Sequence, residues 1–169
     1  MNAALAVEEL LVTATGYDRL CSELETLRTD GRRAMSERLL EARADGHLED
    51  NPSLFEVLEE HAQLERRIAT LEACLAAARI AEPNRDGTAG IGSSVRLRDV
   101  GTSEVVEYEV VGAIEGNAGQ GRVSVDAPVG RALLGAAAGD SVTVACPRGD
   151  LRFEVLSVTD AEPQAREAA

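Results

Sequence analysis

The chain has 169 residues, a formal net charge of −13 at pH 7 and only 2% aromatic residues. Proteins that bind nucleic acid on their own usually carry a basic patch that displaces counterions, so this charge argues against free binding to DNA or RNA. Scarce aromatic side chains favour thin interfaces of Leu and Ala, as in paired helices, over one large core.

The three cysteines, Cys21, Cys74 and Cys146, are far apart and odd in number, a pattern that suggests neither a disulfide framework nor a zinc site. The N-terminal segment is apolar, but it has no basic residue and is interrupted by Glu8 and Glu9, which makes it a poor signal peptide. No stretch reaches the length of a transmembrane helix. We therefore expect a reduced, cytoplasmic protein with no membrane partner.

An N-terminal arm of residues 1–12 precedes a long helical pattern. Thr13 or Thr15 can cap the start of this helix, and apolar residues then recur at spacings of three and four as far as Ala42. Gly31 is a weak point within the pattern, where we expect a bend or thin packing but no break. Gly46 ends the helix as a left-handed cap.

A second helix is predicted to begin directly after a short turn. Asp50 or Asn51 supplies the N-cap oxygen, and Pro52 suits the first helical position. A long helix with an apolar seam needs a partner helix along its whole length. The first helix is that partner, and the short turn between the two makes the pair antiparallel. The sequence thus predicts a coiled-coil hairpin over residues 13–80 with its tip at 46–52. Its seam steps alternately by three and four residues: Leu54, Val57, His61, Leu64, Ile68, Leu71, Leu75 and Ala78.

The second half of the chain has a different pattern. Residues 81–90 contain Pro, Asn, Asp and Gly without periodicity and are interpreted as a linker. From residue 91 the hydrophobic period becomes two, which predicts strands at 94–98, 105–111, 122–125, 141–145 and 151–158, with a short helix at 128–134. The fold class is therefore α+β, with a β-rich domain over residues 91–160 and a polar tail at 161–169.

The chain from Thr15 to Val158 resembles the bacterial Gre factors, GreA and GreB, in the order and spacing of its motifs. The resemblance implies an N-terminal antiparallel α-helical coiled-coil hairpin followed by a C-terminal FKBP-like domain. The residues that carry it lie at the start of the hairpin, at its tip, on the returning helix and in the β-rich domain: Thr15-Gly16, Glu41-Ala42-Arg43, Gly46, Leu48, Asn51, Glu65-Arg66-Arg67-Ile68, Val111-Gly112 and Ser124 through Gly135.

Because these motifs match the Gre factors in order and spacing, the resemblance also implies RNA polymerase as the partner. In the family the FKBP-like domain docks at the rim of the polymerase secondary channel, and the hairpin reaches through that channel to the active site. Carried over to this sequence, the implied contacts are Arg43, Leu48 and Asn51 on the hairpin and Pro128, Leu134 and Gly135 in the β-rich domain.

The hairpin tip departs from the family pattern. There, two carboxylates in a Gly-Asp-Leu-x-Glu-Asn context help to hold a second Mg²⁺, which stimulates cleavage of backtracked RNA. In this chain the first acid position is His47 and the second is Asp50, one methylene shorter than Glu. Neutral imidazole is a poor ligand for this hard ion. We expect no tightly bound cofactor, with Asp50 as the candidate ligand of a transient Mg²⁺ and Glu49 as a nearby acid.

The basic patch that the family carries beside the tip is only partly present. Arg43 is kept, while the returning helix has Leu58, Glu59 and Glu60 at the corresponding place. A grip on the 3′ end of RNA is therefore weakened. Asp50 and Asn51 also have a purely structural interpretation as helix caps.

Three functional hypotheses remain open. In the leading one, the protein binds RNA polymerase through the secondary channel and modulates elongation with weak or no transcript cleavage. In the second, cleavage is retained and Asp50 and a neighbouring acid hold Mg²⁺. In the third, the scaffold is a repurposed enzyme acting on a small molecule in specialised metabolism, with His47 and His61 as acid or base. A structural role for His61, fixing the register of the seam, is the simpler interpretation.

Overall fold

The computed structural model describes residues 10–44, 51–82, 84, 86–145 and 149–160 of the chain. The chain divides into two compact units. One unit is Asp18–Ala77, and the other combines the residues up to Tyr17 with those from Ala78 onward. The first unit is helical and the second contains all of the described strands, which confirms the predicted α+β class.

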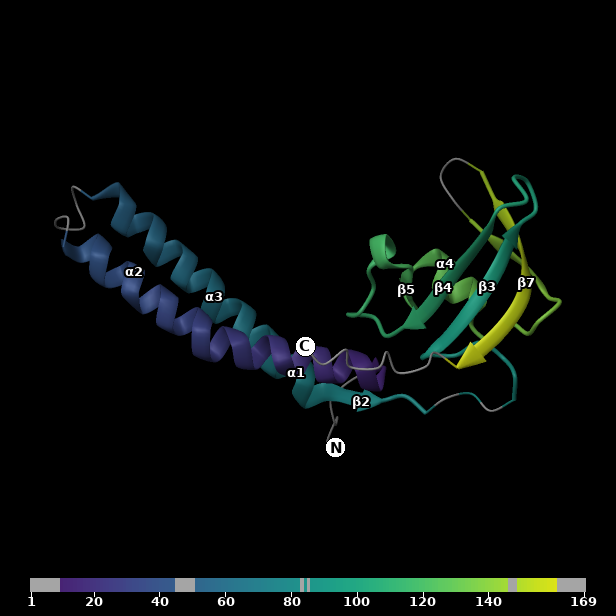
Figure 1. The fold of residues 1–169 in the computed structure, drawn as a ribbon, viewed down its shortest axis with the longest axis horizontal. Coiled ribbons are helices and arrows are strands. Elements are labelled where there is room, and N and C mark those ends of the chain that lie inside the picture. Colours follow the sequence, from purple (N-terminus) through teal and green to yellow (C-terminus); the bar gives the residue numbers. More distant parts are fainter. Residues whose placement is uncertain (1–9, 45–50, 83, 85, 146–148, 161–169) are drawn as a thin grey trace, which may run out of the picture. The chain divides into compact units, whose positions relative to one another are not determined.

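The helical unit is an antiparallel pair (Figure 1). One arm consists of α1 (Ala14–Thr26), a π-helical turn (Leu27–Gly31) and α2 (Arg32–Ala44), and the other is α3 (Pro52–Ala77). The heptad seam predicted the buried face correctly, and α3 begins at Pro52 as expected. The buried seam side chains come from both arms: Leu24, Met35, Ala42, Leu54, Val57, Ile68 and Leu71.

The π-helical turn corresponds to one extra residue in the seam of the first arm. The N–H of Arg32 donates to the carbonyl of Leu27, five residues earlier, as in a π-helix. The expected weak point at Gly31 is thus a wide turn, and the helix continues through it. The seam residues Leu20, Leu24, Leu27, Gly31, Met35, Leu39 and Ala42 are separated by steps of four, three, four, four, four and three, whereas a heptad alternates between three and four.

The second unit is built on a five-stranded sheet in the order β5-β4-β3-β7-β6. Its strands are β3 (Ser93–Asp99), β4 (Val105–Val111), β5 (Arg122–Ser124), β6 (Ser141–Val144) and β7 (Leu151–Asp160). All neighbours are antiparallel except β4 and β5. Helix α4 (Pro128–Leu133) and the 3₁₀ turn η3 (Ala118–Gln120) lie between β4 and β6 in the chain. The core is rich in Val and Leu: Val95, Leu97, Val110, Leu133, Val144, Phe153 and Val155.

Two short strands lie where the sequence analysis placed other structure. Leu10–Val12 forms β1 and pairs in parallel with β2 (Ala78–Ile80), so the expected N-terminal arm ends in a strand and the returning helix stops before residue 78. Part of the expected linker also belongs to the sheet unit, because Thr88 bridges to Ala137 and Ala89 is buried in the core. Segments of three residues are too short for a hydrophobic period to identify them.

Candidate functional site

The residues at the centre of the expected site, His47, Leu48, Glu49 and Asp50, lie outside the described residues. The other expected site residues fall on two surfaces. Arg43, Asn51 and His61 belong to the helical hairpin, while Pro128, Leu134 and Gly135 belong to the sheet unit.

Asn51 joins the two arms of the hairpin next to the tip. Its Oδ1 accepts a hydrogen bond from the N–H of Leu54 at 3.1 Å and another from the hydroxyl of Ser53 at 2.9 Å. Its Nδ2 donates to the carbonyl of Ala42 at 2.8 Å, and the residue is only 7% exposed. The predicted N-cap of α3 is therefore confirmed, and the same side chain ties the end of α2 to the start of α3.

Among the described residues of the hairpin, four ion pairs between the arms define its two flanks. Two pairs join residues that directly follow a seam position, on what we call the first flank. Two join residues that directly precede a seam position, on the second flank. The first-flank pairs are Arg28–Glu72 at 2.6 Å and Arg32–Glu65 at 2.7 Å, and the second-flank pairs are Glu23–Arg67 at 2.6 Å and Arg38–Glu60.

The Arg32–Glu65 pair changes the pKa of its carboxylate. Arg32 donates to both carboxylate oxygens of Glu65, at 2.9 and 2.7 Å. This hydrogen bonding, helped by the nearby charges of Arg32 and His61, lowers the pKa of Glu65. His61 itself is half-buried at its seam position, in keeping with the predicted register role, which stays a prediction.

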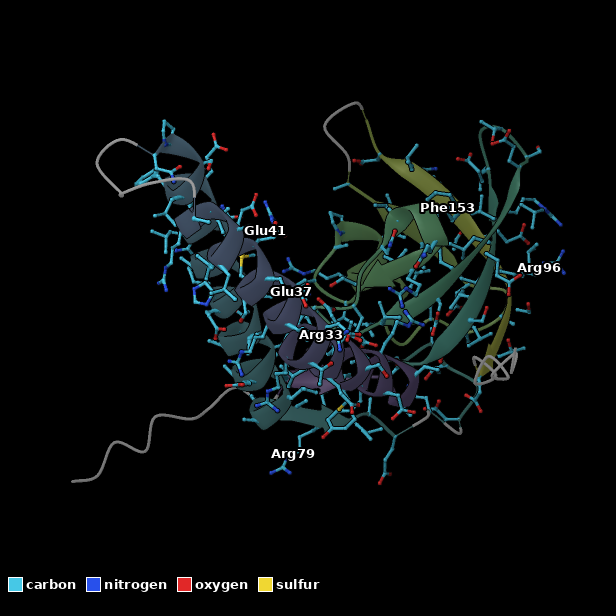
Figure 2. All side chains as sticks on the ribbon, turned by 60° about the vertical axis from the view of Figure 1, so that its left-hand side comes forward. Arg33, Glu37, Glu41, Arg79, Arg96 and Phe153 are labelled. Atoms are coloured by element: carbon cyan, nitrogen blue, oxygen red, sulfur yellow. The ribbon has the colours of Figure 1, made fainter. Side chains whose placement is uncertain are left out.

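The hairpin end next to the tip, Ala34–Ala44 with Asn51–Gln63, is here called the tip-proximal half. Arg38 is paired with Glu60 across the arms, and Arg43 is exposed. Figure 2 shows Glu37 and Glu41 on successive turns of α2. Among the described residues, four exposed carboxylates of this half form no ion pair across the arms: Glu37, Glu41, Glu56 and Glu59.

In the sheet unit, α4 holds the other expected contact residues on a fixed turn. Pro128 is exposed at the start of α4, and Leu134, which directly follows the helix, is 45% exposed. Gly135 has a φ of +78°, a conformation that favours glycine, and its N–H donates to the carbonyl of Ala89 at 2.8 Å. The turn is thus anchored to the core while the Leu134 side chain is left in solvent.

A buried carboxylate that the sequence analysis did not identify lies in the sheet unit. Glu115 is 6% exposed and accepts three hydrogen bonds: from the N–H of Thr13 at 2.9 Å, from the Thr13 hydroxyl at 2.6 Å and from the N–H of Gly112 at 2.9 Å. Thr13 Oγ1 in turn accepts from the N–H of Gly16 and so caps α1, as predicted. These four residues are here called the Glu115 clamp.

Two glycines leave the space that the Glu115 clamp needs. A Cβ at Gly16 would lie 1.5 Å from Oε1 of Glu115, and a Cβ at Gly112 would lie 2.1 Å from the carbonyl oxygen of Leu11. Any side chain at either position would therefore displace the carboxylate or β1. Because the carboxylate already accepts hydrogen bonds at both oxygens inside the fold, we assign the clamp a structural role.

Within the described ranges, no group of three or more His, Cys, Asp or Glu side chains is arranged to hold a metal ion. Of the helices in the part of the chain that the structure describes, none is both long and apolar enough to cross a membrane. The candidate Mg²⁺ ligand Asp50 lies outside this part.

Two family models match the chain. Residues 10–80 match "Transcription elongation factor, N-terminal", and residues 83–160 match "Transcription elongation factor, GreA/GreB, C-term". The chain is 39% identical over 154 residues to transcription elongation factor GreA of Chlorobaculum parvum, covering 89% of this chain and 97% of that protein. It is also 39% identical over 157 residues to GreA of Alkaliphilus oremlandii, covering 92% and 99%. Among solved structures, GreA factor homolog 1 of Thermus thermophilus is 31% identical, covering 90% of this chain and 99% of that one, with a TM-score of 0.42.

Proposed function

The chain belongs to the GreA/GreB family of transcription elongation factors, and on that basis we propose that it binds RNA polymerase and modulates elongation with weak or no stimulation of transcript cleavage. In this proposal the hairpin enters the secondary channel and the turn after α4 contacts its rim. The observation that carries the proposal is the charge of the hairpin end. From Ala34 to Gln63 the sequence has two arginines, Arg38 and Arg43, against eight acids: Glu37, Glu41, Asp45, Glu49, Asp50, Glu56, Glu59 and Glu60.

This charge supports entry of the hairpin without a grip on RNA. An RNA 3′ end is held mainly through its phosphates by Arg and Lys. Arg38 is already paired with Glu60 inside the hairpin, which leaves Arg43 as the arginine of this half without an ion pair among the described residues. An acidic arm with one available cation repels backtracked RNA more than it positions it.

The donor set at the tip also fits Mg²⁺ poorly. His47 replaces one acid of the family pattern and offers imidazole, and Asp50 is shorter than the usual Glu. Mg²⁺ takes oxygen ligands and demands near-ideal octahedral geometry. The proposed mechanism therefore uses the hairpin as an arm that contacts protein, with no step that depends on a metal held by this chain.

Two assays with purified bacterial RNA polymerase test the proposal. In the first, the labelled full chain is titrated with polymerase, and we expect saturable binding that added GreA competes away. In the second, stalled backtracked complexes are incubated with the chain, and we expect RNA cleavage no faster than with polymerase alone. Absence of binding would remove the proposal. Cleavage that is lost in Asp50→Ala would replace it with the active cleavage-factor hypothesis.

A further inference from the structure

We propose that the first flank of the tip-proximal half, through Leu40, Phe55 and Leu58, packs against an apolar patch on the protein wall of RNA polymerase. This inference rests on the proposed function and deepens it. It names the residues that make the contact and the chemistry of the surface that receives them.

These three side chains are large, apolar and exposed to solvent, whereas the other large apolar side chains described in the hairpin are at least partly buried. Leu40 is 67% exposed, Phe55 63% and Leu58 37%. Among the described residues of Asp18–Ala77, all the exposed large hydrophobic side chains are these three. The hairpin does not need them for its own packing, because the buried cluster of this half is made by Met35, Ala42, Leu54 and Val57. Their concentration near the tip marks a binding surface.

The three residues lie on the same flank of the hairpin. Leu40 directly follows the seam residue Leu39, and Phe55 and Leu58 directly follow Leu54 and Val57. Positions that directly follow the seam in two antiparallel helices face the same side, because the helices have the same hand and run in opposite directions. The Arg28–Glu72 and Arg32–Glu65 ion pairs, which join such positions, confirm this geometry further along the hairpin.

The second flank of the same half has the opposite character. Glu41 directly precedes the seam residue Ala42, Glu56 directly precedes Val57, and Arg38 and Glu60 form an ion pair on the same side. One side of the hairpin end is thus largely apolar but also carries Arg43, which directly follows the seam residue Ala42, and the other side is acidic. Such an arm fits a channel within a protein whose wall is apolar on one side. It suits a nucleic acid poorly, because phosphates would meet acids on one flank and, apart from the single cation of Arg43, hydrocarbon on the other.

The small size of the surface favours a large partner over a second copy of the chain. Side chains of this kind at these exposures offer roughly 300 Å² together, whereas a stable dimer buries about 800 Å² on each partner. Two copies, each with a net charge of −13, also repel each other. The flank is therefore suited to be one contact of a larger interface. RNA polymerase provides such an interface if it also contacts the turn after α4.

Alanine substitution tests this contact in the intact protein. The variants are Phe55→Ala, Leu58→Ala and the triple variant Leu40→Ala/Phe55→Ala/Leu58→Ala, all at exposed helical positions where alanine is well tolerated. Each full-length variant is labelled and titrated with RNA polymerase by fluorescence anisotropy. We expect the triple variant to bind at least about tenfold more weakly. Val100→Ala, which truncates a side chain that is 57% exposed in the sheet unit, is the matched control and should bind like wild type.

The outcomes separate this inference from the proposed function. If wild type fails to bind polymerase, both are overturned. If wild type binds and the triple variant keeps its affinity with unchanged helical circular dichroism, the inference alone is overturned. Sedimentation of the wild type as a dimer, lost in the triple variant while polymerase affinity is kept, would identify the flank as a self-association surface and would also overturn it.

Discussion

The Glu115 clamp and the tip-proximal half of the hairpin differ in whether their side chains have partners within the fold. In the clamp, both carboxylate oxygens of a buried Glu accept hydrogen bonds, and two glycines leave the space for it. In the tip-proximal half, large apolar side chains lie in solvent and several carboxylates have no ion pair among the described residues. Groups satisfied within the fold hold the chain together, and groups left without internal partners are available to another molecule.

The largest effect is expected at the clamp. Glu115→Ala leaves the N–H groups of Thr13 and Gly112 without their buried acceptor, and this loss should lower the free energy of unfolding by about 3 kcal/mol. Urea denaturation followed by the fluorescence of the two tyrosines, Tyr17 and Tyr108, measures it; Tyr108 packs on the sheet core. The control Glu104→Ala removes an exposed carboxylate and should change stability by less than about 0.5 kcal/mol. Equal stability of the two variants would refute the assigned role.

A smaller loss is expected where the two arms meet at Asn51. Asn51→Ala removes the cap of Leu54 N–H and the donor to the Ala42 carbonyl, so it should destabilise the hairpin by about 1–2 kcal/mol. Asn51→Ser restores the cap but is too short to reach Ala42. Its thermal unfolding midpoint, followed by circular dichroism, should fall between those of wild type and Asn51→Ala. A serine variant no better than the alanine variant would show that capping contributes nothing here.

Deleting a whole residue should have little effect at the π-helical turn. Removal of the exposed Thr29 restores the seven-residue separation that a heptad requires between the seam residues Leu27 and Met35, so the unfolding free energy should stay within about 1 kcal/mol of wild type. Deletion of the exposed Ala69 on α3 is the matched control. It moves the seam residues beyond it out of phase and should cost more than about 3 kcal/mol. Similar losses in both deletions would contradict the extra-residue account.

The smallest effect concerns pH and the Arg32–Glu65 pair. Because the pKa of Glu65 is lowered in the folded chain, the pair contributes stability above the ordinary Glu value of about 4.3 and loses it as the pH falls through the lower folded-state value. The melting midpoint of Glu65→Gln should therefore be below that of wild type at neutral pH and converge with it in acid. Glu59→Gln, at an exposed carboxylate that has no ion pair among the residues the structure describes, should show no such convergence.

Long, regular patterns made much of this fold predictable. The heptad steps from Leu54 to Leu75 identified the hairpin seam, and the Asn51-Pro52 pair identified where α3 begins. The π-helical turn was also visible in the sequence, since Leu27 and Met35 are eight residues apart where a heptad requires seven.

Contacts between residues that are far apart in the sequence could not be predicted. Thr13 and Glu115 are 102 residues apart, and nothing near Glu115 in the sequence distinguishes it from an exposed acid. The exposed flank of the tip-proximal half became visible only when the arms were paired, because Leu40 comes from one arm and Phe55 and Leu58 from the other. Contacts of the chain with another molecule leave still weaker signals in a single sequence.

Hydrogen exchange of the full chain, measured by mass spectrometry with and without RNA polymerase, tests the central claim most directly. The account predicts that polymerase slows exchange in peptides from Ala34–Ala44 and Asn51–Gln63, while peptides around Glu115 exchange equally slowly in both samples. If polymerase leaves the tip-proximal half unchanged, the claim that this end of the hairpin is the working surface is contradicted.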